Sequence, residues 1–557
     1  MRVPKEQYVN NTPKADAPQV MTTAEAVTAQ LIRNGIDTIY ALPGVQNDYL
    51  FDAFAGVSDK LRIVHTRHEQ GAAYMALGAA LATGKPQVFA VAPGPGILNA
   101  TAAMSTAYAL NAPVLALTGQ IASNAIGRGL GLLHEIPDQL GVLRSLTKWA
   151  ARIHAPYEAA ARVNDAFVQM QSGRPRPVAL ECAPDVWPQR APVALLGAAD
   201  PLKTPINTDT VKAAAKLLAG AKHPLIIAGG GALDASVPLR EVAEILQAPV
   251  SSHRTGRGAL DTRHPLSVNS AVGHRLWRDA DVVLAVGTRL QLQQLQWGLD
   301  EKIKIVRIDA DPDELNRIRP ASVGIVGDAK DALQALADEL RNAAVEKNSR
   351  SGEIDKLRAL SDADWSQCKP QIAFLDAIRD ELPEDGIFVD ELTQLGYVSR
   401  LSFPIYKPRT FITPGYQGTL GWGLATALGA KAAMPDKAVV AVSGDGGFMF
   451  NVQELATAVQ HRIPVVIVLM NDGAFGNVLR TQGEDFGNRL IATHLRNPDF
   501  VKLTESFGAL GLRATTPEEL RKAVRKGLDA GMPTVIEVPV GPLPSPWNVL
   551  RFTRSRP

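Results

Sequence analysis

Two stretches of this sequence align with each other without a gap. Residues 76–114 match residues 427–465, with "ALGA" at the start of both and Pro-Val at the end of both. Each stretch alternates short apolar runs with segments of helical spacing, which is the pattern of a parallel sheet covered by helices. Two unrelated α/β domains would share residue types, because both need apolar strands and amphipathic helices. They would be less expected to align over 39 residues without a gap. The chain is therefore expected to contain a duplicated α/β domain.

The 557 residues are too many for one hydrophobic core, and the strand and helix patterns divide into three units. We expect three doubly wound parallel-sheet domains of the α/β class, the first and third related by duplication. The expected segments are a flexible tail at 1–20, a first domain at 21–185, a linker at 186–204, a central domain at 205–340, a linker at 341–370, a third domain at 371–540 and a C-terminal tail at 541–557.

Composition narrows the partners and the compartment. The chain has 58 basic and 56 acidic residues, which gives no reason to expect a nucleic-acid partner or an anionic membrane. No run approaches the roughly 18 apolar residues of a membrane span, and the first twenty residues lack the apolar stretch of a signal peptide. The two cysteines, Cys182 and Cys368, indicate neither a disulfide framework nor a cysteine-based metal site. We expect a cytoplasmic enzyme.

Two aspartates mark the predicted site. Asp445 lies in the turn "GDGG" after an apolar strand, and Asp472 follows the next strand after one intervening helix. A right-handed crossover places both carboxylates at the ligand-binding edge of neighbouring parallel strands. Adjacent carboxylates repel unless a cation lies between them, and Mg²⁺ prefers such oxygen ligands together with phosphate oxygens. Either turn alone is common, but the pair brackets one strand–helix–strand unit and predicts a metal that holds a phosphate-bearing ligand.

The segment "GDGGFMFNVQELATAVQHRIPVVIVLMND" resembles the signature of thiamine-diphosphate-dependent enzymes, especially the acetolactate synthases, in a family with pyruvate oxidases and benzaldehyde lyase. The resemblance covers about residues 20–540, in the order pyrimidine-binding, central and diphosphate- and magnesium-binding domain. It implies that Mg²⁺ is held by the side chains of Asp445 and Asp472 and the main-chain carbonyl of Ala474. The family usually has Asn at position 472, so the aspartate here adds negative charge and leaves the choice of metal open. The implied cofactor contacts are Glu69, Thr393, Gln394, Gly418, Leu420, Gly444, Asp445, Gly446, Gly447, Asp472, Ala474, Phe475 and Gly476.

The resemblance also implies catalytic roles. In the family, the glutamate at position 69 contacts N1′ of the aminopyrimidine and activates the cofactor through a shared proton; the alternative is a glutamate that only favours a helix N-terminus. The repeat pairs Glu69 with Leu420, the implied wedge that bends the cofactor, so both residues are expected to begin equivalent helices; the alternative is a core leucine. His134 lies in a loop that matches one near the reacting atoms, at a position where acetolactate synthases carry Gln; it is a candidate acid–base group or else a solvent-facing loop histidine. His68 is expected to be structural.

The middle domain and the assembly follow from the same resemblance. Segments at Gly230, Arg289 and Asp309 resemble those that hold FAD or ADP in the family, although glycine turns after strands are also generic. The sequence therefore leaves open whether FAD is bound, and FAD is a candidate cofactor to be tested. Because the family builds each site from two subunits, a homodimer is the smallest expected assembly, and homotetramers are common.

The expected reaction is that of an acetolactate-synthase-like enzyme that decarboxylates a 2-oxo acid and transfers the acyl carbanion equivalent to an acceptor. Acetolactate synthases usually carry Met and Trp where this chain has Asn477 and Thr481, so the substrate pocket is expected to differ. One alternative is a lyase or hydrolase that cleaves a C–C bond in a 2-hydroxy ketone, diketone or 2-hydroxyacyl-CoA. Another is a non-catalytic regulatory homologue, against which the intact Glu69 and Asp445 argue.

Overall fold

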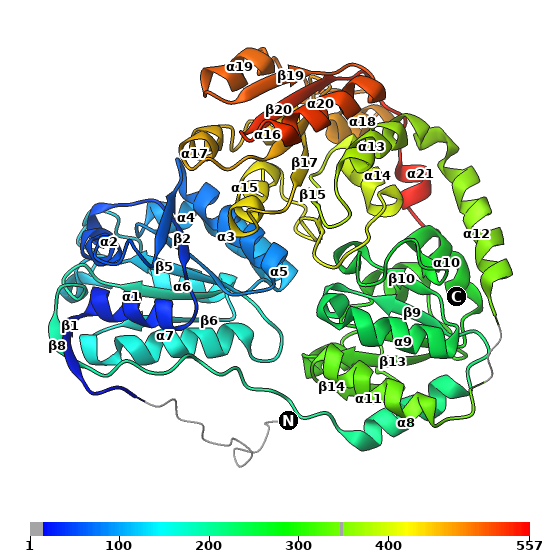
Figure 1. Ribbon diagram of the computed structural model, residues 1–557, viewed down its shortest axis with the longest axis horizontal. Coiled ribbons are helices and arrows are strands. Elements are labelled where there is room, and N and C mark those ends of the chain that lie inside the picture. Colours follow the sequence, from blue (N-terminus) through cyan, green and yellow to red (C-terminus); the bar gives the residue numbers. More distant parts are fainter. Residues whose placement is uncertain (1–14, 346–348) are drawn as a thin grey trace. The chain divides into compact units, whose positions relative to one another are not determined.

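The computed structural model describes residues 15–345 and 349–557. The described residues form three six-stranded parallel sheets, covered by helices, and one two-stranded antiparallel sheet (Figure 1). This arrangement confirms the predicted α/β class with three parallel-sheet domains. The chain divides into two compact units: one runs to Ala76 and from Pro86 to Leu202, and the other comprises Leu77–Lys85 and Lys203–Pro557.

The first sheet has the strand order β3-β2-β4-β5-β7-β6. Its first helix begins with a capping box, in which Thr22 and Glu25 each bind the other's backbone N–H, as the sequence predicts. Helices α1 and α7 pack against each other and against the apolar face of this sheet. The elements of this domain are β2 (Thr38–Ala41), β3 (Arg62–His65), β4 (Gln87–Val91), β5 (Val114–Gly119), β6 (Trp149–Ile153), β7 (Val178–Cys182), α1 (Thr23–Arg33), α2 (Asp48–Ala55), α3 (Glu69–Thr83), α4 (Pro95–Asn99), α5 (Thr101–Leu110), α6 (Gln139–Leu146) and α7 (Pro156–Gln171).

The third domain repeats the topology of the first. Its strand order, β16-β15-β17-β18-β20-β19, follows the same succession along the chain as the order of the first sheet. The shared succession agrees with the duplication predicted from the internal alignment. The elements of this domain are β15 (Ile387–Val389), β16 (Phe411–Ile412), β17 (Val439–Gly444), β18 (Val466–Asn471), β19 (Leu510–Arg513), β20 (Thr534–Pro539), α13 (Lys369–Glu381), α14 (Gln394–Ser402), α15 (Gly423–Ala433), α16 (Asp445–Phe448), α17 (Glu454–Gln460), α18 (Gly476–Asp485), α19 (Phe500–Ser506), α20 (Pro517–Asp529) and α21 (Trp547–Leu550).

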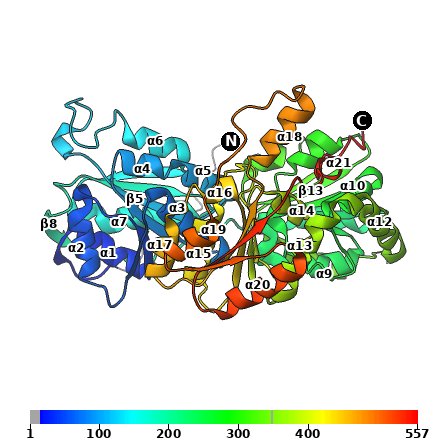
Figure 2. The same cartoon turned by 90° about the horizontal axis from the view of Figure 1, so that it is seen from above.

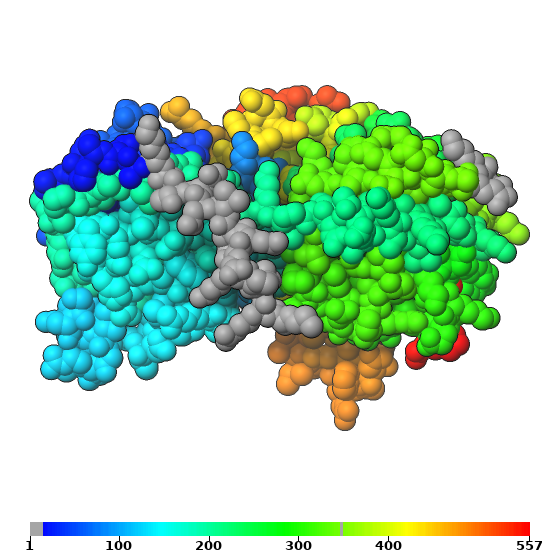
Figure 3. All heavy atoms as spheres, turned by 90° about the horizontal axis from the view of Figure 1, so that it is seen from below, coloured from blue at the N-terminus to red at the C-terminus, as the bar shows by residue number. Residues whose placement is uncertain are grey.

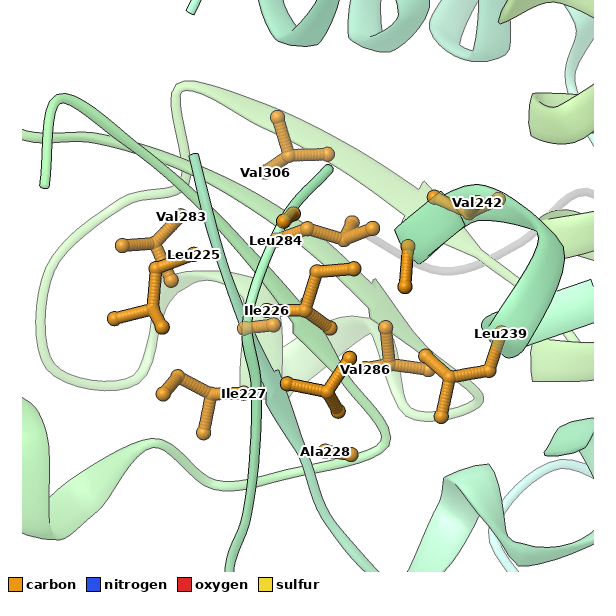
Figure 4. Close-up of a cluster of buried hydrophobic side chains, with 14 of the residues drawn as sticks. Leu225, Ile226, Ile227, Ala228, Leu239, Val242, Val283, Leu284, Val286 and Val306 are labelled. Carbon is orange, nitrogen blue, oxygen red and sulfur yellow. The ribbon is translucent and has the colours of Figure 1, made fainter. Parts of the chain in front are cut away.

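The middle domain has the strand order β11-β10-β9-β12-β13-β14, which is the order of a dinucleotide-binding sheet. Its strands are apolar on both faces because helices cover both. Figure 4 shows this core, where Ile226 of β9 and Leu284 of β12 face Val242 of α9. The elements are β9 (Leu225–Ala228), β10 (Val250–Ser252), β11 (Ser267–Val268), β12 (Val282–Val286), β13 (Lys304–Asp309), β14 (Val323–Val326), α8 (Thr208–Ala219), α9 (Ser236–Leu246), α10 (Ser270–Asp279) and α11 (Ala329–Arg341).

The connecting segments also carry regular secondary structure. The expected linker at 186–204 contains β8 (Arg190–Val193), which pairs antiparallel with β1 (Gln19–Thr22) at the end of the expected N-terminal tail. Residues 1–14 of that tail lie outside the described residues. The expected linker at 341–370 contains α12 (Ser351–Asp364), and its residues 346–348 are also outside the described range.

Two further features bear on the environment of the chain. Cys182 and Cys368 are both buried and free. Among residues 15–345 and 349–557, we find no helix with the length and apolar character needed to cross a membrane.

Candidate active site

Asp445 and Asp472 lie at the carboxyl ends of neighbouring strands. Asp445 begins α16 directly after β17, and Asp472 follows β18, its parallel neighbour in the sheet. One carboxylate oxygen of Asp445 accepts hydrogen bonds from the Gly473 N–H at 2.9 Å and from Asn497 Nδ2 at 2.6 Å. The first of these bonds ties the turn after β17 to the turn after β18. The crossover geometry therefore brings together the two aspartates that the sequence singled out.

The pKa values of both carboxyl groups are raised above the ordinary value, first of all by burial. Asp445 is almost fully buried, and this burial raises the pKa of its carboxyl above the ordinary value. Burial, reinforced by the charge of Asp445, raises the pKa of Asp472 to about 6. Two like charges in a poorly hydrated site are stabilised by a cation between them, so the arrangement suits a divalent metal.

The expected third metal ligand lies in a firmly anchored segment. The Phe475 N–H donates to the Thr493 carbonyl at 2.8 Å, and the Leu495 N–H donates to the Gly473 carbonyl at 2.7 Å. These bonds form a short bridge around Ala474, which leaves its backbone held beside the two aspartates. Gly446 makes this packing feasible, because a Cβ there would lie 2.5 Å from the Phe475 ring. Gly476 then begins α18.

Thr393 and Gln394 occupy the start of α14, at the end of β15. The Thr393 hydroxyl caps this helix by accepting the Gly396 N–H at 2.9 Å. The Gln394 amide oxygen accepts a hydrogen bond from Arg480 of α18 at 2.9 Å. A Cβ on Gly444 would meet the Thr393 methyl group at 3.4 Å, so the loops after β15 and β17 lie in contact. Both side chains therefore sit beside the aspartate turns.

One sequence expectation about Leu420 is wrong. Glu69 begins α3, but α15 begins at Gly423, so Leu420 lies in the preceding loop rather than at a helix start. The reason is local: Gly421 has φ +76 and packs under Phe450, which delays the helix. Leu420 is half-buried in this loop. Gly418 also has positive φ, and the nearest atom to a Cβ there would be 3.7 Å away, so the loop leaves open space at that residue.

A buried glutamate that the sequence reasoning missed connects these loops. Glu391 follows β15 and is 1% exposed, and its carboxylate accepts hydrogen bonds from the Ser443 hydroxyl and the Gly421 N–H. A Cβ on Gly447 would lie 2.5 Å from this carboxylate. Burial raises the pKa of Glu391 to about 7. Its position directly after a buried strand, in "VDELTQ", was the available signal.

Replacing Glu391 with glutamine should raise stability at alkaline pH. The folded protein holds the Glu391 proton more tightly than the unfolded chain, because the folded pKa is about 7 and the ordinary value is 4.5. Stability from this group is therefore full below about pH 4.5 and is lost as the pH rises through 7. We expect Glu391→Gln and wild type to melt alike at pH 4, below the ordinary pKa of 4.5. At pH 8 the variant should be more stable by up to about 3 kcal/mol. Thermal denaturation of the cofactor-free protein at both pH values measures this, and parallel pH profiles would contradict it.

Glu69 lies at the N-terminus of α3 in the first unit. Asn99, at the end of α4, donates its side-chain amide to the Glu69 carboxylate at 3.0 Å. Gly96 borders the same carboxylate, since a Cβ there would lie 3.4 Å from one of its oxygens. The Glu69 side chain is 16% exposed, so one oxygen is fixed while the group still reaches the outside. Neighbouring His68 accepts the Gln70 N–H through Nδ1 at 3.2 Å, which agrees with a structural role for this histidine.

His134 lies in a loop of the first unit and is half-buried. Its Nδ1 lies 2.9 Å from the side-chain oxygen of Gln46, and the amide of Gln46 donates to the Leu133 carbonyl at 3.2 Å. The backbone of His134 has φ 68 and packs directly against Gly94. The ring is therefore oriented by a side-chain partner rather than left loose in solvent.

The three positions expected to hold FAD are engaged inside the second unit. The Arg289 guanidinium stacks over the Tyr416 ring at 4.7 Å, and the Asp309 carboxylate accepts the Asp311 N–H at 3.0 Å. The glycine run at 229–231 packs against the loop after β12, because a Cβ on Gly229 would lie 2.3 Å from the Gly287 carbonyl. A Cβ on Gly230 would meet neighbouring atoms only at ordinary contact distance. These contacts give the glycines a packing role and engage Arg289 and Asp309 with neighbouring residues of the second unit.

We therefore expect the purified protein to show no flavin absorbance. The internal contacts of Arg289 and Asp309 would have to break before either side chain reached the cofactor. A visible absorbance spectrum of the protein, before and after incubation with FAD and desalting, measures this directly. A retained flavin band in stoichiometric amount would contradict the expectation.

The C-terminal segment reaches the helix that carries the expected substrate residues. Trp547 of α21 donates from Nε1 to the Asn477 side-chain oxygen of α18 at 2.7 Å, and its ring lies 4.8 Å from that of Tyr397. Figure 2 shows α18 and α21 near each other on one side of the second unit, and Figure 3 shows the orange α18 region protruding from that unit. Thr481 lies one turn further along α18. The sequence alone does not place this tail, because its partners lie far away along the chain; Asn477 is 70 residues from Trp547.

Replacing Trp547 with phenylalanine should change substrate affinity without loss of the cofactor. Phenylalanine keeps the ring contact with Tyr397 but cannot donate to Asn477, so the Asn477 side chain is no longer fixed. Loss of one such hydrogen bond corresponds to about a 2- to 10-fold change in KM. Steady-state kinetics together with cofactor titration measure both quantities. Equal losses in cofactor affinity and KM would point instead to a general disturbance of the domain.

Comparison with known proteins identifies the family to which this chain belongs. Three family models match the chain: the N-terminal TPP-binding domain of thiamine pyrophosphate enzymes at residues 21–142, their central domain at 211–336, and their C-terminal TPP-binding domain at 393–538. The last contains both site aspartates, and the first contains Glu69 and His134.

Relatives that match over most of their length support the same family. A probable 2-ketoarginine decarboxylase of Pseudomonas aeruginosa is 34% identical, over 93% of this chain and 94% of its own length. A probable acetolactate synthase large subunit of Methanocaldococcus jannaschii is also 34% identical, over 94% of this chain and 92% of its own. The large subunit of acetolactate synthase isozyme 3 of Escherichia coli is 30% identical, over 92% and 93% respectively. The chain therefore belongs to the thiamine-pyrophosphate-dependent enzymes and is acetolactate-synthase-like.

Proposed function

We propose that the protein uses thiamine diphosphate and Mg²⁺ to decarboxylate a 2-oxo acid and to transfer the acyl group to an acceptor. The observation that carries this proposal is the pair of carboxylates, the buried Asp445 and the half-buried Asp472, at the ends of neighbouring strands in a TPP-binding domain. Two neighbouring carboxylates favour a divalent metal between them, and this domain family binds a diphosphate at the same place.

The residues present fit such a metal. Two carboxylates and the Ala474 carbonyl are hard oxygen donors, and Mg²⁺ completes its octahedron with phosphate oxygens and water. Within residues 15–345 and 349–557, no three His, Cys, Asp or Glu side chains gather as a dedicated cage. A site of two carboxylates therefore suits a metal that shares its ligands with a bound diphosphate.

The chain's own residues would orient the cofactor and move protons. Bound thiamine diphosphate supplies the nucleophilic carbon and accepts the electron pair that remains when CO₂ leaves. Glu69, fixed by Asn99, would exchange a proton with the aminopyrimidine ring, and Leu420 would support the bent cofactor. His134, oriented by Gln46, would give or take a proton at the substrate oxygen.

The substrate pocket supports a donor or acceptor other than those of the acetolactate synthases. Asn477 and Thr481 are polar where those enzymes usually carry Met and Trp, and Asn477 is fixed by Trp547. Decarboxylation without transfer is the second candidate, because one relative of similar identity is named a probable 2-ketoarginine decarboxylase. The two candidates share the first half of the reaction and differ in whether a carbonyl acceptor or a proton takes the acyl group.

A substrate panel separates these candidates. The protein loaded with thiamine diphosphate and Mg²⁺ is incubated with 2-oxo acids that include pyruvate and 2-ketoarginine, and CO₂ release is measured. Products with and without an added aldehyde or 2-oxo acid acceptor then distinguish an aldehyde from a ligated hydroxy ketone. No CO₂ from any member of the panel would remove the proposal and favour C–C cleavage of a 2-hydroxy ketone, diketone or 2-hydroxyacyl-CoA.

The proposed assembly is a homodimer or homotetramer in the cytoplasm. It rests on the family pattern in which Glu69 of one subunit completes the site formed by Asp445 of another. Mixing inactive Glu69→Gln and Asp445→Ala proteins tests this pattern, because subunit exchange would restore part of the activity in hybrid sites. Failure to complement after verified exchange would contradict a shared site.

A further inference from the structure

One cavity lies entirely within the second unit. None of the residues that line it belongs to the candidate active site. It has a volume of about 380 Å³ and is bordered by the segment from β10 to α10, by α12 and by the C-terminal end of α14. This volume falls in the range of small-molecule sites. Exposed Asp362 and Arg263 contribute to its wall, so the cavity reaches the surface.

The cavity is strongly basic. Four arginines line it, Arg257, Arg263, Arg358 and Arg400, and the only lining carboxylate is Asp362. Arg263 is paired with Asp261 and Glu384, Arg358 with the exposed Asp355, and Arg400 with Asp390, so three of the four arginines have a carboxylate partner.

Arg257 has no such balance. Its guanidinium is 7% exposed and donates to the main-chain carbonyls of Ser399 and Phe403, and in the described part of the chain it forms no ion pair. Burial lowers the pKa of Arg257 to about 10. A buried cation whose hydrogen-bond acceptors are neutral carbonyls leaves a field that Asp390 offsets only in part and that an anion in the adjoining cavity would satisfy.

Hydrogen-bond donors without partners line the same cavity. Ser361 of α12 is fully buried, and its hydroxyl has no hydrogen-bond partner within residues 15–345 and 349–557. The Ser252 hydroxyl of β10 and one terminal nitrogen of Arg400 are buried and equally without a partner there. Buried polar groups normally form hydrogen bonds. Three buried donors without an acceptor around one basic cavity therefore indicate that a ligand with acceptor atoms belongs there.

We propose that this cavity binds a small oxoanion, the phosphate or carboxylate group of a metabolite, through Arg358, Arg400 and Ser361. A guanidinium presents two parallel N–H groups that match either oxoanion, and a serine hydroxyl adds a third donor from α12. Because the walls come from the middle domain, α12 and the third domain, the bound anion would join all three segments. The proposal does not depend on the reaction proposed above.

Calorimetric titration tests the site. The protein is first loaded with thiamine diphosphate and Mg²⁺, so that phosphate cannot occupy the cofactor site, and is then titrated with inorganic phosphate and separately with malonate. We expect one anion per chain. Arg358→Gln should weaken binding about tenfold or more, because a charged donor is lost, and Ser361→Ala should weaken it about 2- to 10-fold. Preference for phosphate or for malonate identifies which oxoanion the site takes, and either supports the proposal.

A matched control is Arg278→Gln. Arg278 is an exposed arginine of the same unit, paired with Asp279 and outside the cavity, so its variant should bind like wild type. Arg358 also donates to the carbonyls of Pro265 and Ser267, and its loss can disturb folding. Ser361→Ala removes only an unpartnered hydroxyl and remains informative in that event. No binding of either anion, or unchanged affinity in both Ser361→Ala and a folded Arg358→Gln, would overturn the proposal.

Discussion

Replacing Glu69 with glutamine should lower kcat by about 10²–10⁴-fold while the protein still binds thiamine diphosphate. Glutamine keeps the size of the side chain and can still accept the hydrogen bond from Asn99, so the start of α3 should be unchanged. It cannot, however, exchange a proton with the aminopyrimidine ring. The expected signature is a large loss of turnover with little change in cofactor affinity.

Steady-state CO₂ release and titration of the cofactor measure the two quantities separately. Asn99→Ala is the matched control, because it removes the partner of Glu69 and leaves the carboxylate in place; its loss of kcat should be about tenfold. Turnover unchanged in Glu69→Gln would remove the proposed activation route. A loss confined to cofactor affinity would assign Glu69 to binding alone.

Replacing Asp445 with alanine should abolish metal-dependent cofactor binding. Asp445 supplies the buried oxygen donor that also ties together the turns after β17 and β18 through the Gly473 N–H. Changes to groups that only support a metal ligand cost about 10–100-fold in affinity, so loss of the ligand itself should cost on the order of 100-fold or more. Titration of thiamine diphosphate at fixed Mg²⁺ concentration gives the value.

Asp472→Asn provides the comparison for Asp445→Ala. Asparagine keeps an oxygen donor at this position and removes one of the two charges that repel each other, as in most members of the family. We expect the Asp472→Asn protein to bind the cofactor within about tenfold of wild type. Equal cofactor affinity in wild type and Asp445→Ala would show that the metal lies elsewhere.

The fold could be predicted from the sequence because its signals are local and repeated. The apolar runs at β4, β5, β17 and β18 are long enough to be recognised, and each precedes a helix of clear spacing. The two-stranded sheet of β1 and β8 could not be predicted, because neither short segment alternates clearly and their pairing spans about 170 residues. The late start of α15 also escaped prediction, since it depends on Gly421 meeting Phe450.

Some residues of the candidate site could likewise be predicted from the sequence, and others could not. Asp445 and Asp472 could be found because each follows a strong strand, and the crossover rule places them side by side. Asn497 could not be found, because it reaches Asp445 from an irregular loop 52 residues further on. Glu391 lies only two residues before Thr393, which the sequence did single out. Its burial and its hydrogen bonds with Ser443 and Gly421, however, follow only from the packing of three loops.

The C-terminal segment also affects how the middle domain matures during synthesis. Arg556 is 6% exposed, lies against the carbonyls of Trp277 and Ala280 and pairs with Asp300, while Phe552 stacks on His274. These partners lie more than 250 residues apart in the chain. A ribosome adding about 5–20 residues per second needs roughly 13–50 s to cover that distance. During that interval His274 and Trp297 lack the Phe552 ring that packs on both, so the nascent middle domain leaves this aromatic surface uncovered.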